Sequence, residues 1–224
     1  DEKRAHILGV SLDKKELDGK TFVRMASTDG KRLSKVDHLL EEGQAFDLQE
    51  NIIIPKKGLT EVNRLLDGEG LVAIGIKDNH FVVKKDNETI IVSLLEGMFP
   101  EFEQVIAKDD AFSIDIDKHL FHMMLKRMSI LSTEDYRSVI FNFRNDKLVI
   151  TTTNPTIGES KEEMHIDFGR EEVEIAFNPK YFLETLGSIK EDKIVLNIEN
   201  EEKPCLVEGA LDKTYLSVIM PMKI

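Results

Sequence analysis

The amino-acid sequence predicts an α+β fold in which two copies of one domain follow each other along the chain. The first observation is that most of the chain consists of short runs rich in Val, Ile and Phe, separated by polar turns. The second is that only a few segments show the apolar spacing of an amphipathic helix. The third is an internal repeat that relates the second half of the chain to the first.

The strand-like runs come first in the chain. "HILGVSLD", "TFVRMAST", "NIIIP", "LVAIGI", "HFVVKK" and "TIIVSLL" are all short and rich in β-branched or aromatic residues. Polar turns such as "DKKELDGK", "DGEG" and "KDNE" lie between them. We therefore expect each run to be a β-strand.

Three segments have helical spacing instead: residues 58–66, 117–131 and 179–189. The last of these begins with strong local signals. Asn178 is a favourable N-cap residue, and Pro179 suits the first helical position because its missing N–H is not needed there.

The internal repeat is seen in two pairs of similar segments. Residues 51–76 and 174–198 both read as a strand with Pro-Lys near its end, a short amphipathic helix, an acidic turn and a strand. Residues 4–35 and 136–162 both read as a strand, a turn, a strand ending in Ser and Thr, and a further strand. Because the order is the same in both halves, the chain is predicted to contain two equivalent domains.

The repeat places the domain boundary in a polar stretch near the middle of the chain. We expect the first domain to be residues 1–108 and the second to be residues 109–224. The second copy opens with a strand and a long helix at 111–135 that have no counterpart before residue 4. The first copy is therefore expected to lack its opening strand and helix.

Composition limits the classes of function. With 41% hydrophobic residues the chain can bury a core, so it is not a disordered segment. Its formal net charge of -12 argues against nucleic-acid binding through a broad basic patch. The single cysteine excludes an intramolecular disulfide and fits a reducing, cytoplasmic compartment. No apolar run approaches the roughly 18 residues of a membrane helix.

The sequence offers no catalytic signature. His119 and His122 are spaced as half a metal site, but no third ligand stands beside them, which favours a solvated helix face. Cys205 lies in the apolar run "PCLV" and is interpreted as a buried small hydrophobe. Asp115 and Asp117 flank a helix start, where a carboxylate stabilises the helix N-terminus. No catalytic residue, metal or cofactor is therefore expected.

Three stretches carry a resemblance to a known family. "ASTDGKRLSKV" (26–36), "EGMFPEFEQVI" (96–106) and the final "VIMPMKI" resemble stretches of the bacterial DNA polymerase III beta subunit, the family of replicative sliding clamps. "NIIIPKKGLTEV" and "NPTIGESKEEM" are also similar to family segments. The matches lie in family order over essentially the whole chain. They identify its two copies as the second and third domains of a clamp.

The resemblance implies a DNA clamp fold. In this family two subunits form a ring head to tail, and each subunit has three domains built from tandem repeated β-α-β-β-β units. Helices line the inner face and sheets lie outside. By this resemblance Ile130 and Leu131 belong to the subunit interface. The chain is expected to be a fragment that lacks the first domain, and hence to be monomeric.

The resemblance also implies a non-enzymatic function. Clamps are processivity factors. Each is an accessory subunit of the polymerase III holoenzyme that encircles duplex DNA and holds polymerases, the clamp loader and repair proteins. This implies a cytoplasmic, nucleoid-associated protein without a membrane partner. A protein held by topology needs little direct affinity for DNA, which reconciles the acidic charge with local inner cations. The candidate DNA-facing residues are Lys56, Lys57, Arg64, Lys118, Lys126 and Arg127. Ordinary solvation of these helices explains the same cations equally well.

Clamp partners dock short, partly hydrophobic peptides in one pocket, and this explains the apolar end "LSVIMPMKI". An apolar pocket with a few polar groups at its rim suits a peptide anchor, and methionines adapt to several partners. A purely structural last strand is the alternative. The residues assigned to the pocket by resemblance are Arg4, Ile7, Thr28, Gly30, Lys31, Arg32, Leu33, Pro100, Gln104, Val105, Tyr181, Pro204, Val218, Met220, Pro221 and Met222.

Two other functions remain open from the residues alone. A metal-dependent nuclease or hydrolase of the α+β class would use acidic residues at strand ends to bind magnesium. A plain protein-interaction module would use the apolar C-terminal pocket without any DNA role.

Overall fold

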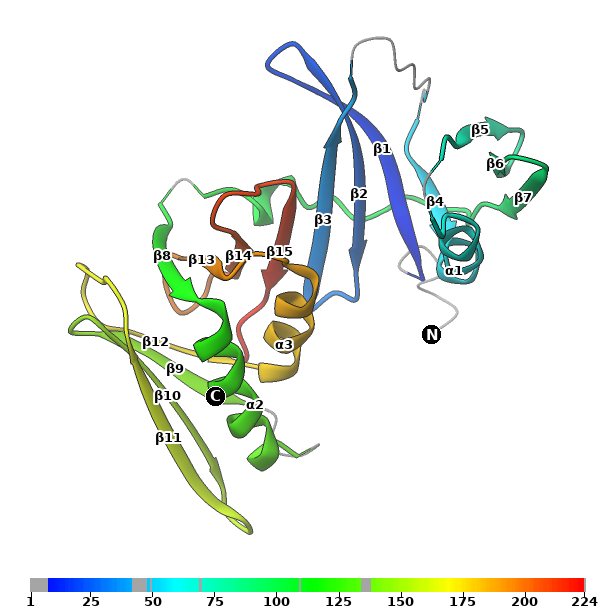
Figure 1. Cartoon of the computed structure of the whole chain (residues 1–224). Coiled ribbons are helices and arrows are strands. Elements are labelled where there is room, and N and C mark those ends of the chain that lie inside the picture. Colours follow the sequence, from blue (N-terminus) through cyan, green and yellow to red (C-terminus); the bar gives the residue numbers. More distant parts are fainter. Residues whose placement is uncertain are drawn as a thin grey trace. The chain divides into compact units, whose positions relative to one another are not determined.

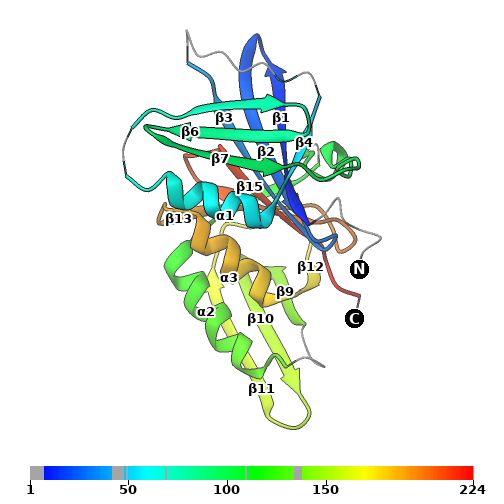
Figure 2. The same ribbon diagram turned by 90° about the vertical axis from the view of Figure 1, so that its right-hand side faces the viewer.

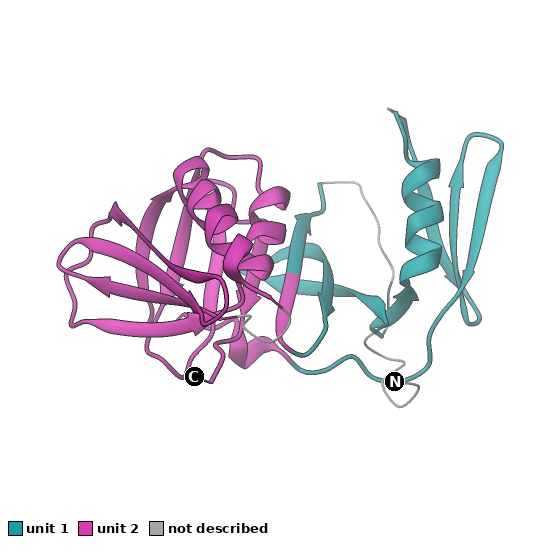
Figure 3. Ribbon diagram, turned by 90° about the horizontal axis from the view of Figure 1, so that it is seen from below, with its two compact units in different colours: residues 1–30, 35–101 teal, residues 31–34, 102–224 magenta. Residues whose placement is uncertain are grey.

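A computed structural model describes residues 8–41, 48, 50–68, 70–108, 110–133 and 138–223. The chain divides into two compact units, shown in different colours in Figure 3. The first unit comprises residues 1–30 and 35–101, and the second comprises residues 31–34 and 102–224.

The first unit contains two antiparallel sheets and one helix (Figure 1). In one sheet the strands follow the order β4-β1-β2-β3, and in the other they follow the order β5-β6-β7. The elements are β1 (Gly9–Leu17), β2 (Lys20–Thr28), β3 (Arg32–Leu39), β4 (Ile52–Pro55), α1 (Lys56–Leu65), β5 (Ala73–Lys77), β6 (His80–Lys85) and β7 (Glu88–Ser93).

Helix α1 packs against β4 and β7 across a small apolar core (Figure 2). Val62 is the helix residue buried in this core. Gly58 brings the helix close to the sheet: a Cβ at this position would lie 2.2 Å from Cγ1 of Val92 on β7. The core consists of Leu12, Ile54, Val62, Phe81, Val83 and Val92.

The second unit contains two sheets and two helices. Its strand orders are β11-β10-β9-β12 and β8-β13-β14-β15, with residues 31–34 beside β15. A short 3-10 turn, η2 (Glu103–Val105), precedes them. The elements are β8 (Phe112–Asp117), α2 (Lys118–Leu131), β9 (Val139–Arg144), β10 (Lys147–Asn154), β11 (Gly158–His165), β12 (Val173–Phe177), α3 (Pro179–Ser188), β13 (Lys193–Ile198), β14 (Cys205–Gly209) and β15 (Tyr215–Ile219).

Side-chain caps fix the starts of the two helices of the second unit. Asp117 Oδ1 accepts a hydrogen bond from the N–H of Leu120 at 2.8 Å. Asn178 Oδ1 accepts one from the N–H of Lys180 at 3.0 Å, and Pro179 follows as expected. Each cap satisfies a backbone donor that the first helical turn leaves without a partner. The caps predicted at Asp117 and Asn178 are therefore confirmed, whereas Asp115 lies within β8 and caps no helix.

Helices α2 and α3 lie side by side over a core dominated by phenylalanine (Figures 1 and 2). The ring of Phe121 on α2 meets the rings of Phe141 and Phe182 edge-on, with centroids 5.9 and 5.8 Å apart. Such edge-to-face pairs add about 0.5–1.5 kcal/mol each to the burial of the rings. Cys205 is buried in the same core, and burial raises the pKa of its thiol. Its interpretation as a small hydrophobe is confirmed.

The two units repeat one another in element order. Strands β1, β2, β3 and β4, helix α1 and strands β5, β6 and β7 correspond to β9, β10, β11 and β12, α3 and β13, β14 and β15. The sheet orders also agree, and the second unit adds β8 and α2 in front. The hairpin turns of β1–β2 and β9–β10 both hold two residues of positive φ, Asp18–Gly19 and Asn145–Asp146. The predicted internal repeat is confirmed.

Among the described residues, no helix is both long enough and apolar enough to cross a membrane.

Candidate functional site

The second unit brings residues 31–34 against the C-terminal segment. The backbone N–H of Met220 donates a hydrogen bond to the carbonyl oxygen of Lys31 at 3.0 Å. Leu33 and Val218 are both buried in one apolar cluster. Two segments that the sequence assigned to one pocket are therefore neighbours. The remaining members of this cluster are Leu206 and Leu216, with Phe102 and Ile106 packed against them.

Arg32 connects the same segment to helix α3. Its guanidinium carbon lies 4.5 Å from the centroid of the Tyr181 ring. Its Nη1 also donates to Oε2 of Glu184 at 2.6 Å. A cation over an aromatic face contributes about 0.5–1 kcal/mol at an exposed site, and the carboxylate fixes the direction of the guanidinium. Arg32 and Tyr181 were predicted, whereas Glu184 was missed, although it follows Tyr181 by one helical turn.

The residues after β15 stay attached to the second unit. The N–H of Met222 donates to the carbonyl oxygen of Ala176 on β12 at 2.8 Å, in an isolated antiparallel bridge. Pro221 lies between the two bonded methionines and has no N–H to leave unsatisfied. Met220, Pro221 and Met222 are all half-buried. They therefore offer partly open apolar surface in a fixed backbone conformation.

A cavity of about 170 Å³ opens beside the segment that follows η2, and we call it the linker cavity. Gln104, Val105 and Pro204 of the predicted pocket line it. Leu206 lines it as well and also belongs to the apolar cluster around Leu33, so the cavity backs onto that cluster. Its other lining residues are Ala107, Asp110, Ala111, Glu199 and Lys203.

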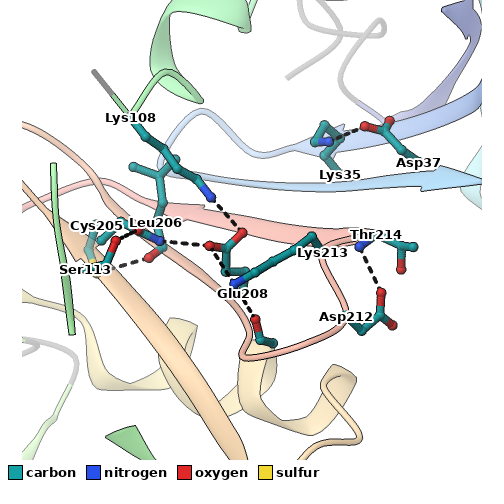
Figure 4. Close-up of polar contacts among 12 residues, drawn as sticks. Lys35, Asp37, Lys108, Ser113, Cys205, Leu206, Glu208, Asp212, Lys213 and Thr214 are labelled. Atoms are coloured by element: carbon teal, nitrogen blue, oxygen red, sulfur yellow. Dashed lines mark hydrogen bonds and ion pairs between the residues drawn. The ribbon is translucent and has the colours of Figure 1, made fainter. Parts of the chain in front are cut away.

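The buried carboxylate of Glu208 binds two lysines of the second unit (Figure 4). The Glu208 side chain on β14 is 7% exposed; Lys108 Nζ lies 2.7 Å from its Oε2 and Lys213 Nζ lies 3.1 Å from its Oε1. Burial alone raises the pKa of this carboxyl, but the hydrogen bonds and charges of both lysines outweigh burial and lower it overall. The charged pair therefore ties Lys108, and the segment around it, to β14.

Sequence reasoning missed Glu208 and Lys108. The only local signal for Glu208 was a charged residue within the otherwise apolar run "CLVEG". A charge in such a run is expected to find a partner when it is buried.

Three further pocket residues lie in the first unit: Thr28, Gly30 and Pro100. Thr28 Oγ1 accepts a hydrogen bond from the N–H of Gly30 at 3.1 Å, and this bond shapes the turn that leads to Lys31. Pro100 is exposed. Arg4 and Ile7 lie outside the described residues.

The candidate cations on α1 are all exposed: Lys56, Lys57 and Arg64. Arg64 pairs with Glu61 on the same helix at 2.7 Å. Exposed pairs of this kind are weak, about 0.3–0.5 kcal/mol, so the guanidinium can exchange this carboxylate for another anion.

The candidate cations on α2 have different surroundings. Lys126 is exposed, whereas Arg127 forms an ion pair with Glu162 on β11. Lys118 is half-buried, and its Nζ donates to the carbonyl oxygen of Ile189 at 2.7 Å. Ile189 is the C-cap residue of α3, so Lys118 satisfies one of the carbonyls that a helix C-terminus leaves open. Of these three side chains, that of Lys126 is the most available for a ligand.

The two residues predicted for a subunit interface end helix α2. The Ile130 side chain is 73% exposed, while Leu131 is half-buried and its carbonyl accepts a hydrogen bond from Asn154 Nδ2 at 3.0 Å. His119 is exposed and His122 half-buried on the same helix. Within the described part of the chain, no three His, Cys, Asp or Glu side chains are grouped so that they could hold a metal ion.

Comparison with known proteins decides the family. The family model for the DNA polymerase III beta subunit, central domain, matches residues 1–101, and the one for its C-terminal domain matches residues 103–223. The chain belongs to the DNA polymerase III beta subunit family. This confirms the resemblance on which the site residues were chosen.

Curated members of this family are named beta sliding clamps. The clamp of Chlamydia pneumoniae is 31% identical over 200 residues, which cover 89% of this chain and 54% of the relative. The clamp of Proteus mirabilis is 30% identical over 206 residues, covering 91% of this chain and 55% of the relative. The chain thus spans about half the length of the curated relatives it matches.

Solved structures confirm the clamp fold. The sliding clamp of Bartonella birtlesii bound to griselimycin superimposes with a TM-score of 0.92 and 25% identity, covering 100% of this chain and 60% of that one. A Caulobacter crescentus clamp has a TM-score of 0.91 and 26% identity, again covering 100% of this chain and 60% of the other.

Proposed function

We propose that this chain supplies the central and C-terminal domains of a non-enzymatic DNA sliding clamp, the processivity factor of a bacterial polymerase III holoenzyme. The observation that supports it most is the match of both family domains, in order, along the chain. Membership in this family favours a clamp over the metal-dependent nuclease that the residues alone left open. As domain limits we propose 1–108 and 109–224; the two family matches meet a few residues earlier, at 101 and 103.

In this proposal a closed ring holds duplex DNA by topology. A ring needs no strong phosphate binding, so a net charge of -12 is compatible with sliding. Local cations on α1 and α2 keep the duplex centred, with Lys56, Lys57 and Lys126 the most available. The head-to-tail dimer of the complete protein uses Ile130, whose exposed apolar side chain suits a subunit contact. The protein acts in the cytoplasm, on the nucleoid.

The same proposal assigns a peptide-binding site to the C-terminal segment and residues 31–34. Polymerase subunits, the clamp loader and repair proteins dock short apolar peptides there. Half-buried methionines at 220 and 222 supply adaptable apolar surface, and the backbone bond between Lys31 and Met220 fixes it. Arg32, held by Tyr181 and Glu184, provides a polar group of set direction.

Loading onto circular DNA tests the clamp function. The complete protein, with its clamp loader and ATP, should remain on nicked circular DNA during gel filtration at moderate salt. Cutting the circle should release the protein, because a ring slides off a free end. Equal retention on circular and linear DNA would contradict topological holding, and no retention on either would favour a protein-interaction module without a DNA role.

A further inference from the structure

Apolar and acidic residues both line the linker cavity. Val105, Pro204 and Leu206 supply apolar surface, together with two alanines. The exposed Asp110 and the half-buried Glu199 add two carboxylates, and we call this pair the rim. A lysine or arginine side chain has the matching character, since its methylene stem is apolar and its head is a cation. We propose that the linker cavity selects partner peptides that carry a basic residue beside their apolar anchor.

This inference rests on the proposed peptide-binding function and narrows the class of peptide. Gln104, Val105 and Pro204 belong both to the cavity and to the predicted pocket, so in this proposal an anchored peptide lies beside the cavity. Asp110 and Glu199 were not among the predicted pocket residues. They lie on the segment before β8 and on the segment directly after β13.

The size of the cavity fits a single side chain. Its volume of about 170 Å³ is well below the range of roughly 300–1,000 Å³ that holds a drug-sized ligand. A flexible chain of methylenes with a charged head suits a space of this size.

The carboxylates of the rim have acceptor capacity to spare. Glu199 Oε1 accepts a hydrogen bond from Asn200 Nδ2 at 3.2 Å, and its second oxygen makes no hydrogen bond to the described residues. The Asp110 carboxylate likewise has no hydrogen-bond partner within the described part of the chain, although its backbone oxygen accepts from Arg170 Nη1 at 3.1 Å. A bound ammonium or guanidinium can therefore bond to both carboxylates.

Lys203 is the opposing charge in the cavity lining. It lies on the exposed turn before β14, where a long side chain can turn into solvent. The side chains that line the cavity are therefore net acidic, with two carboxylates and one lysine, while Arg170 lies next to Asp110 and bonds to its backbone oxygen. Two contacts hold the segment that carries Asp110: Lys108 pairs with Glu208, and the backbone oxygen of Asp110 accepts a hydrogen bond from Arg170. A preformed site loses less entropy when the side chain enters.

Two labelled peptides test the inference. Both are fluorescein octapeptides with the same centre of two leucines and one phenylalanine; one has a lysine on each side of this centre, and the other has a glutamate on each side. Fluorescence anisotropy with the purified chain measures both affinities at low and high salt. We expect the lysine peptide to bind about five- to tenfold more tightly at low salt, and the preference to shrink as salt screens the rim.

Matched variants locate the effect. Glu199→Gln and Asp110→Asn should each lower the preference for the lysine peptide about two- to threefold, by removing one charge at near-constant shape. Glu201→Gln, on the same exposed turn but outside the cavity lining, should leave it unchanged. Thermal melts confirm that all variants stay folded.

The outcomes separate the two proposals. Equal binding of both peptides, tighter binding of the glutamate peptide, or an undiminished preference in Glu199→Gln would each overturn the acidic rim while leaving peptide binding intact. Binding of neither peptide would overturn the rim and the proposed peptide-binding site together.

Discussion

The backbone N–H of Met220 donates a hydrogen bond to the carbonyl of Lys31, so the C-terminal segment is held beside residues 31–34 of the second unit. The bond uses main-chain atoms only. The half-buried Met220 side chain is therefore held in place while part of its surface stays open. Truncation of the Met220 side chain should therefore leave this backbone hydrogen bond intact.

Met220→Ala should lower the affinity for a partner peptide about tenfold while leaving the fold intact, because truncating an apolar anchor removes contact area and little else. Isothermal titration with the octapeptide that carries lysines measures the affinity. Met123→Ala, the same change on the exposed side of α2, is the control and should bind the peptide with the affinity of the parent. Unchanged affinity in Met220→Ala would exclude this residue from the peptide site.

Glu208 should make the second unit sensitive to acid. Its pKa in the folded state lies below the ordinary value of 4.5, because Lys108 and Lys213 outweigh the effect of burial. The stabilisation is therefore complete above that ordinary value and is lost as the pH falls through the lower folded-state pKa. Glu208→Gln should cost about 2 kcal/mol at neutral pH, since hydrogen bonds to charged groups contribute about 1.5–3 kcal/mol.

Urea unfolding over a pH series checks this prediction. The difference in unfolding free energy between the parent and Glu208→Gln should shrink as the pH falls below 4.5. Glu202→Gln, an exposed glutamate on the turn before β14, serves as the control and should show almost no difference at any pH. A constant difference across the whole range would mean that the charge of Glu208 does not contribute to stability.

Local signals predicted much of the fold. Asn178 and Pro179 set the start of α3 by capping and by fixed φ, and the internal repeat predicted the order of the strands. The start of α1 was predicted two residues late, at 58. Pro55 occupies its N-cap without a side-chain hydrogen bond, so no polar cap marks that boundary in the sequence.

The site was only partly predictable, because its contacts are long-range. The resemblance named Arg32 and Tyr181, and the structure joins them. The pair of Lys108 and Glu208 spans most of the second unit's sequence, and no spacing rule relates two such distant residues. Likewise, the sequence shows Lys118 as one more helix cation, while its bond to the Ile189 carbonyl depends on how α2 and α3 pack.

Gly58 and Gly187 should respond to alanine in opposite directions. Alanine favours a helix over glycine by about 0.8–1.0 kcal/mol at both positions. At Gly58 a Cβ would lie 2.2 Å from Val92, and overpacking of this kind costs about 1–3 kcal/mol. At Gly187 on α3, no described residue outside its own helix comes within 4 Å of the added Cβ. Thermal melts should show a lower melting temperature for Gly58→Ala and a higher one for Gly187→Ala. A higher melting temperature for both variants would mean that β7 moves away freely from the added methyl group.

Lys126 and Lys118 lie on one helix but should have different roles. Lys126→Met should weaken binding of duplex DNA and reduce the dependence of log affinity on log salt by about one unit, as the loss of one phosphate contact does. Lys118→Met should leave that slope unchanged and lower the melting temperature, because its Nζ already satisfies the carbonyl of Ile189 at the end of α3. Fluorescence anisotropy with a labelled duplex, titrated at several salt concentrations, separates the two effects. Lys161→Met on β11 is the control for a general change of net charge. If the slope of log affinity against log salt is the same for Lys126→Met and this control, Lys126 is not part of the DNA-facing surface.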